Sequence, residues 1–195
     1  MKAHRALGAN RALRPRDRGI LLLGYLLTLF SLSGFASESA QLPALRAAYL
    51  YNFAQLVEWP AATLSSPSAP FLVCLLGVSA ENRRAMAGLE ARRYQGHRIE
   101  VRDIASPSAA DACHILYTDE VNRLSARRIA RALSTAPVLT VDSATGAAAD
   151  GFGIEFISSD GRLRWILNLA AIRTANLRVS SKLIEISLRV VGEEG

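Results

Sequence analysis

Apolar positions along the chain form two patterns, short runs of strand length and longer stretches with helical spacing. The run 71–76 is apolar throughout and ends at Gly77, a pattern typical of a strand buried on both faces. Similar but shorter runs predict strands at 97–101, 114–117 and 138–141. Helices are expected over 42–57, with Pro43 in the first turn, and over 79–89, with Ser79 as the N-terminal cap. A third helix is expected from Thr118 or Asp119 to about Ser134. Its inward-facing residues would be Val121, Leu124, Ile129 and Leu133.

The last part of the chain predicts a hairpin, a short helix and an ambiguous tail. Segments 153–157 and 163–167 flank Ser158-Ser159-Asp160-Gly161, which favours a hairpin turn. Asn168 can cap a short helix, and Asn176 can close it. The tail 182–191 alternates as a strand does, but it also fits a helix capped by Ser180 or Ser181. Periodicity alone leaves both alternatives open.

Strands that alternate with helices and end in a hairpin predict an α/β fold. We expect three layers, with a mostly parallel sheet, an antiparallel hairpin at one edge and helices on both faces. A strand order that starts 2-1-3, as in flavodoxin-like folds, would place the first and third strands side by side.

The first 36 residues have the pattern of a cleavable secretory signal peptide. Six basic residues precede an apolar stretch over 20–32, and Gly34-Phe35-Ala36 then supplies small residues before a cut between Ala36 and Ser37. A membrane anchor needs about 20 apolar residues, which this stretch lacks. The sequence therefore predicts that residues 1–36 are removed, and that 37–195 form a single α/β domain that does not span the membrane and works outside the cytoplasm.

The leader also accounts for most of the positive charge of the chain, which is +6 at pH 7. It holds six of the 23 basic residues and one of the 17 acidic residues, so the rest carries 17 and 16. A nucleic-acid-binding domain would need a large basic surplus, and a net charge of only +1 is left after cleavage.

Two cysteines, Cys74 and Cys113, are the only ones in the chain. In an oxidising compartment an isolated pair favours a disulfide bond. The expected strand order supports the bond, because it brings the first strand beside the third.

Reactive chemistry is not indicated by any motif. The chain has no phosphate-binding glycine loop, no Gly-x-Ser-x-Gly elbow and no metal-ligand spacing, so we expect no catalytic residues, no metal, no cofactor and no enzyme activity. His97 and His114 are interpreted as structural, and the stripe Arg123, Arg127 and Arg131 as a solvated helix face.

Aromatic residues gather on the first helix and at its exit. Tyr49 and Phe53 are expected in the core. Tyr51 and Trp59 are candidates for an interaction surface, because such side chains are favoured where proteins make contacts.

The segment 46–60, which reads RAAYLYNFAQLVEWP, resembles the opening helix of YfiR-like periplasmic proteins down to its closing Glu-Trp-Pro. Segments 113–116, 137–141 and 168–183 are similar to further motifs of that family. The similarity runs from about Leu45 to Val191 and implies an α/β domain with a helical tail, which favours helix for the ambiguous segment.

The resemblance also implies a function. The family's repressors bind the periplasmic sensor domain of an inner-membrane diguanylate cyclase, which lowers cyclic di-GMP and biofilm formation, and an outer-membrane lipoprotein can draw the repressor away. A small-molecule sensor with a pocket near the aromatic helix, or an adaptor for another membrane partner, is the alternative. Whether the protein is a homodimer stays open.

This chain departs from the family pattern near its hairpin. Phe152 and Glu155 stand where the family usually has glycine and asparagine, and Ile166 stands where an acidic residue is common. The second cysteine pair of some members is missing. If this region contacts the cyclase, the choice of partner is expected to differ.

Overall fold

The computed structural model describes residues 37–192. Residues 1–36, with the predicted signal peptide and Ala36, lie outside this range. The α/β unit begins at Ala40. Its elements, with the end of the helix that enters it, are α2 (Ser37–Leu56), β1 (Val57–Glu58), β2 (Phe71–Leu76), α3 (Ala80–Ala87), β3 (Arg93–Tyr94), β4 (His97–Asp103), β5 (Ile115–Thr118), α4 (Arg123–Ala132), β6 (Leu139–Asp142), β7 (Ile154–Ser159), β8 (Arg162–Asn168), α5 (Leu169–Thr174), β9 (Arg178–Val179), α6 (Ser181–Glu185) and β10 (Arg189–Val191).

Eight strands form the main sheet in the order β10-β8-β7-β6-β5-β2-β4-β3. The strands β4, β2, β5, β6 and β7 run parallel, β8 is antiparallel to β7, and β3 is antiparallel to β4. β1 and β9 form a separate antiparallel pair. The predicted fold class is confirmed, and so is the 2-1-3 start, because β2 lies between β4 and β5.

The hairpin forms at the predicted turn, whereas the tail takes a course that the sequence did not indicate. Asp160 and Gly161 both have positive φ, 52° and 69°, which is the backbone of a tight two-residue hairpin turn. Beyond β8 lies β10, which pairs with it in parallel and forms the sheet edge. The tail therefore contains both of the alternatives, first the helix α6, which Ser180 caps, and then the strand β10.

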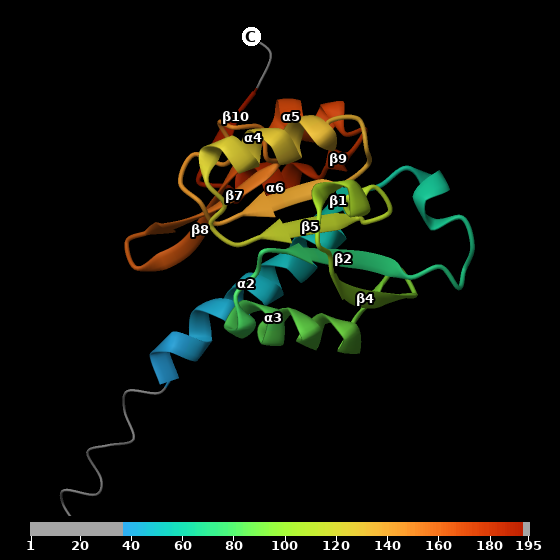
Figure 1. The fold of residues 1–195 in the computed structure, drawn as a ribbon, viewed down its shortest axis with the longest axis horizontal. Helices are drawn as coiled ribbons and strands as arrows, with labels where there is room; N and C mark the ends of the chain where they lie inside the picture. Colours follow the sequence, from blue (N-terminus) through green and yellow to red (C-terminus); the bar gives the residue numbers. More distant parts are fainter. Residues whose placement is uncertain (1–36, 193–195) are drawn as a thin grey trace, which may run out of the picture. The chain divides into compact units, whose positions relative to one another are not determined.

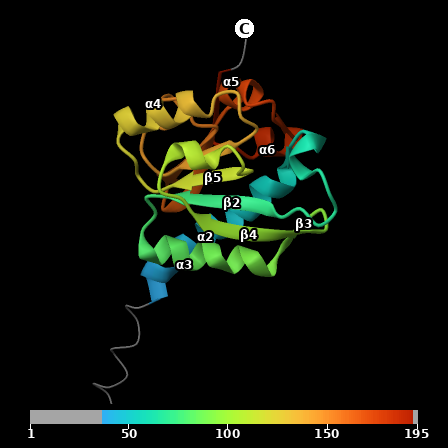
Figure 2. The ribbon, with the colours of Figure 1, turned by 45° about the vertical axis from the view of Figure 1, so that its right-hand side comes forward.

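Helices cover both faces of the sheet, with α2 and α3 on one side of the strands and α4 on the other (Figures 1 and 2). Two hydrophobic clusters result. The larger one joins the sheet to Leu50 and Phe53 of α2, with contributions from α3, α5 and α6. The smaller one lies under α4 and includes both cysteines.

Two helix starts differ from the prediction. α2 begins at Ser37, so Pro43 lies inside the helix and not in its first turn. α4 begins at Arg123, and its cap is Asn122, whose side chain accepts a hydrogen bond from the Ser125 amide at 3.0 Å. With this start Leu124 faces solvent and is 62% exposed, whereas Ile129 and Leu133 are buried as expected.

The departures from the family pattern all lie in the interior. Phe152, Glu155 and Ile166 are 0%, 2% and 4% exposed. The Glu155 carboxylate accepts hydrogen bonds from the Gly146 amide at 2.9 Å and the Ala148 amide at 3.0 Å, so it orders the loop before β7.

We expect Glu155→Gln to lower the free energy of unfolding by about 2 kcal/mol, because the glutamine amide has one acceptor oxygen and no charge for two N–H donors, one of them buried. Urea unfolding measures the difference. Glu90→Gln is the matched control, since Glu90 accepts a single exposed hydrogen bond from the Val101 amide. An equal loss in both variants would contradict the role of Glu155.

Candidate functional site

The aromatic face of α2 packs on the hairpin strands. Phe53 is 1% exposed, and its ring lies 5.2 Å from that of Trp165 on β8 and 5.6 Å from that of Phe156 on β7. Tyr49 is half-buried against the same two strands, with its ring 4.9 Å from that of Trp165. Phe53 therefore lies in the core as expected, and Tyr49 lies at its margin.

A cavity of about 330 Å³ opens next to these rings, between α2 and α6. Its walls are mostly aromatic and aliphatic, with three polar side chains among them. The lining residues are Tyr49, Asn52, Phe53, Gln55, Leu56, Trp165, Lys182, Leu183 and Ile186. The sequence placed a pocket near the aromatic helix as an alternative, but Trp165 and α6 were not part of it.

Tyr51 and Trp59 both contact residues in or next to the edge strand β3. The Tyr51 hydroxyl donates to the Arg93 carbonyl at 3.3 Å, and the Arg92 guanidinium lies 5.3 Å from its ring centre. Trp59 packs edge-on against Tyr94, at 5.7 Å between ring centres. Both side chains are half-buried. Their role in partner binding stays a prediction.

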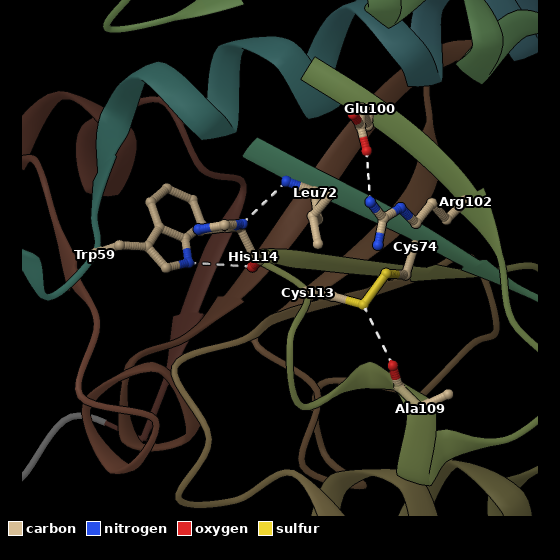
Figure 3. The surroundings of a disulfide bond; sticks show 8 residues. All are labelled: Trp59, Leu72, Cys74, Glu100, Arg102, Ala109, Cys113 and His114. Atoms are coloured by element: carbon tan, nitrogen blue, oxygen red, sulfur yellow. Dashed lines mark hydrogen bonds and ion pairs between the residues drawn. A yellow bond between two sulfur atoms is a disulfide. The ribbon is translucent and has the colours of Figure 1, made fainter. Parts of the chain in front are cut away.

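Trp59 also connects the exit of α2 to the start of β5. Its indole N–H donates to the His114 carbonyl at 3.1 Å (Figure 3). Its ring meets Phe71 edge-on at 5.0 Å. The His114 ring stacks on Phe71, and its Nδ1 accepts a hydrogen bond from the Leu72 amide at 2.9 Å. His97 makes a comparable contact, with Nδ1 2.7 Å from the Ala69 carbonyl oxygen. Both histidines thus make structural contacts with the backbone.

The predicted disulfide between Cys74 and Cys113 is present (Figure 3). It joins β2 to the residues just before β5, with the two Cα atoms 6.0 Å apart. Cys74 is 1% exposed and Cys113 is 4% exposed, so solvent has little access to the bond.

Polar side chains at the carboxyl ends of β5 and β6 form a network that the sequence did not reveal. Buried Thr118 donates to Asp142, and burial raises the pKa of that carboxyl although hydrogen bonds oppose the shift. Asp119 accepts from Asn82 at 2.7 Å and pairs with Arg46 of α2 at 3.4 Å. This network ties α2 and α3 to the sheet, in place of the helix cap expected from Thr118 or Asp119.

The arginine stripe of α4 is held by one carboxylate. Arg123 and Arg127 pair with Asp150 at 3.1 Å and 2.7 Å, and hydrogen bonds from these two arginines hold the pKa of Asp150 below its usual value. The stripe is thus partly paired, where a solvated face was expected.

Metal-binding and membrane-spanning features were searched for among residues 37–192. No group of three or more histidine, cysteine, aspartate or glutamate side chains in this range could hold a metal ion. None of the helices in the same range combines the length and the apolar character needed to cross a bilayer.

These features define a mostly parallel α/β domain that contains one disulfide bond and begins with an aromatic helix. A family model described as YfiR/HmsC-like matches residues 43–187, from the second turn of α2 to just past the end of α6. The chain therefore belongs to the YfiR/HmsC-like family, as its motifs indicated. A search of curated proteins found no significant match.

Proposed function

We propose that this protein is a periplasmic regulator that represses an inner-membrane diguanylate cyclase by binding its periplasmic sensor domain. The observation that carries the proposal is the family match over residues 43–187. The export pattern of residues 1–36 supports it, because a partner domain in the periplasm requires an exported repressor. An outer-membrane lipoprotein that draws the repressor away belongs to the same proposal.

The protein acts by binding and not by catalysis in this proposal. Three residues depart from the family pattern, Phe152, Glu155 and Ile166, and all three are buried. They therefore change the interior, and the surface near the hairpin is formed by other residues. The contact surface that we assign includes Tyr51 and Trp59, which lie at the exit of α2 and beside the edge strand β3.

Deletion of the gene from its host tests the proposal. We expect cyclic di-GMP and surface attachment to rise, and the full-length gene to restore both, whereas a gene without residues 1–36 does not. Mass spectrometry of nucleotide extracts measures the change. Unchanged cyclic di-GMP in the deletion strain would exclude the repressor role.

The contact surface is tested in the same strain. Tyr51→Ala should restore less repression than the unmodified gene at an equal level of folded protein. Leu124→Ala is the matched control, because Leu124 is exposed on α4, away from the aromatic helix. Full repression by Tyr51→Ala would remove Tyr51 from the surface without affecting the proposed repressor role.

The alternative function, a sensor of a small molecule, is favoured by one observation, the cavity between α2 and α6. Sensing and repression are compatible, because a ligand that prefers one state of a protein shifts its population.

A further inference from the structure

The two edges of the main sheet differ in how well they are closed. At one edge lies the short strand β3, and the strand β4 beside it is flanked by the 3-10 helix η3 (Gly88–Ala91). The Glu90 carboxylate of η3 accepts a hydrogen bond from the Val101 amide of β4 at 3.2 Å. Because an unpaired edge strand is a template for another strand, this contact obstructs association at the β3 edge.

The opposite edge, β10, presents backbone groups to the outside. On β8 the Asn168 amide donates to the Gly153 carbonyl just before β7 at 2.9 Å, so Asn168 faces β7 and its neighbour Leu167 faces β10. The parallel register then directs the N–H and C=O of Val190, the Cα partner of Leu167, away from β8. Among residues 37–192 no side chain caps these two groups, in contrast to the β3 edge.

Apolar side chains lie exposed beside the same edge. Ile186 and Leu188, which connect α6 to β10, are 40% and 44% exposed. Leu188 and Val190 alternate with Arg189, so they share one face of the sheet, and on that face Val190 packs against the larger hydrophobic cluster. Outward-facing backbone groups next to exposed apolar side chains are typical of a surface that associates.

The charges of this edge are complementary to a second copy of the same edge. Arg189 is the first residue of β10, and Glu193 and Glu194 follow Gly192 in the sequence. In an antiparallel pair the start of one strand lies beside the end of the other, so each Arg189 would approach the acidic end of the other copy. A parallel neighbour would instead bring the two arginines together.

One two-fold register fits the strand. With the axis at Val190, the Val190 residues of the two copies exchange both of their backbone hydrogen bonds, and Arg189 lies opposite Val191. An axis at Arg189 would place two guanidinium groups opposite each other, which is unfavourable. An axis at Val191 would pair Val190 with Gly192, whose φ of 69° departs from strand geometry.

We propose that this protein forms a two-fold homodimer in which β10 of each copy pairs antiparallel with β10 of the other, so that the main sheet continues across the axis. The same surface serves in both copies, as a two-fold interface requires. Tyr51 and Trp59 contact the opposite edge of the sheet and stay outside this interface, so each dimer carries two contact surfaces for a partner. The dimer does not rest on the repressor role.

Sedimentation velocity tests the proposal on the protein expressed as the full chain and purified as the cell processes it. From micromolar to millimolar concentration we expect a reversible shift from monomer to dimer. Val190→Pro should weaken dimerisation about tenfold or more, because it removes the outward N–H of each copy and thus two hydrogen bonds across the axis. Val190→Ala is the matched control, since it shortens the same side chain but keeps the N–H, and it should weaken the dimer less.

Charge variants test the antiparallel arrangement. Arg189→Glu should weaken dimerisation roughly fivefold, the effect of losing two exposed ion pairs. Exchange of the charges, with Glu193→Arg and Glu194→Arg added to Arg189→Glu, should restore the dimer. Arg128→Glu is the control, because Arg128 is an exposed arginine on α4 and should leave the equilibrium unchanged.

Three results would overturn the proposal: a monomer at every concentration, a dimer that Val190→Pro weakens no more than Val190→Ala does, or a charge exchange that fails to restore what Arg189→Glu loses. The charge variants keep the test valid if the proline variant does not fold. Because association is measured on the purified protein, the dimer can fail while the repressor function stands, and the reverse also holds.

Discussion

Loss of the disulfide should lower the free energy of unfolding by about 4 kcal/mol. Cys74 and Cys113 are 39 residues apart, and in the chain-entropy model a cross-link over such a loop stabilises the folded state by this amount. A domain of this size has about 5–15 kcal/mol in total, so much of its stability depends on one bond. Urea unfolding of the oxidised and the reduced protein measures the difference.

Alanine variants separate the cross-link from the packing of the two sulfur atoms. Cys113→Ala and the double variant with Cys74→Ala should lose nearly the same free energy, because the first substitution already breaks the bond. Losses that add across the two positions would show instead that each side chain contributes by packing alone, since independent sites are additive. Two free thiols in the denatured, unreduced protein would also contradict the bond.

Acidification from pH 7 to pH 4 should lower the free energy of unfolding by about 3 kcal/mol through His114. Burial lowers the pKa of this side chain from 6.5 to about 4, although the nearby Thr63 carbonyl opposes the shift. Between these values the unfolded chain takes up a proton that the folded protein does not. The stabilisation is therefore complete above pH 6.5 and is lost as the pH falls toward 4, at about 1.4 kcal/mol for each unit of pKa difference.

His114→Asn isolates this contribution. The side-chain oxygen of the asparagine can accept the hydrogen bond that the Leu72 amide now donates to the histidine Nδ1. Asparagine has no group that titrates in this range. Denaturant midpoints of this variant should change little between pH 6.5 and pH 5, above the range in which carboxylates dominate. The unmodified protein, measured at the same pH values, is the reference. A dependence that persists in His114→Asn would assign it to other groups.

Elements with a strong local signal were predictable from the sequence. β2 was expected at 71–76 and spans Phe71–Leu76, because its apolar run is bounded by Pro70 and Gly77. The caps Ser79 and Asn168 were also predictable, since their side chains bond amides three residues ahead.

Elements that exist only through long-range pairing left no such signal. β1, β3 and β9 have two residues each, too few for any periodicity. β10 forms because α6 ends and returns the chain to β8, and α4 begins later than expected because Thr118 and Asp119 bond to Asp142, Asn82 and Arg46.

The candidate site was predictable only in part for the same reason. The aromatic helix and the cysteine pair were visible as local composition. The cavity depends on Trp165 and Lys182, which lie far along the chain from α2 and meet it only in the folded domain. Alternation along the hairpin predicts that Trp165 faces inward, but not that it meets the aromatic helix.

The contacts of α2 also determine the order in which the molecule can assemble. Leu56 accepts a hydrogen bond from the Ser180 amide at 2.9 Å, Val57 pairs with Val179, and Phe53 meets Trp165. A chain leaves the ribosome N-terminus first, so this helix emerges more than 100 residues ahead of these partners. Contacts of such large sequence separation form slowly, and until they form the aromatic face of α2 is exposed. The nascent domain thus stays open until its last strands arrive, and during that interval its aromatic helix is prone to aggregate unless another protein covers it.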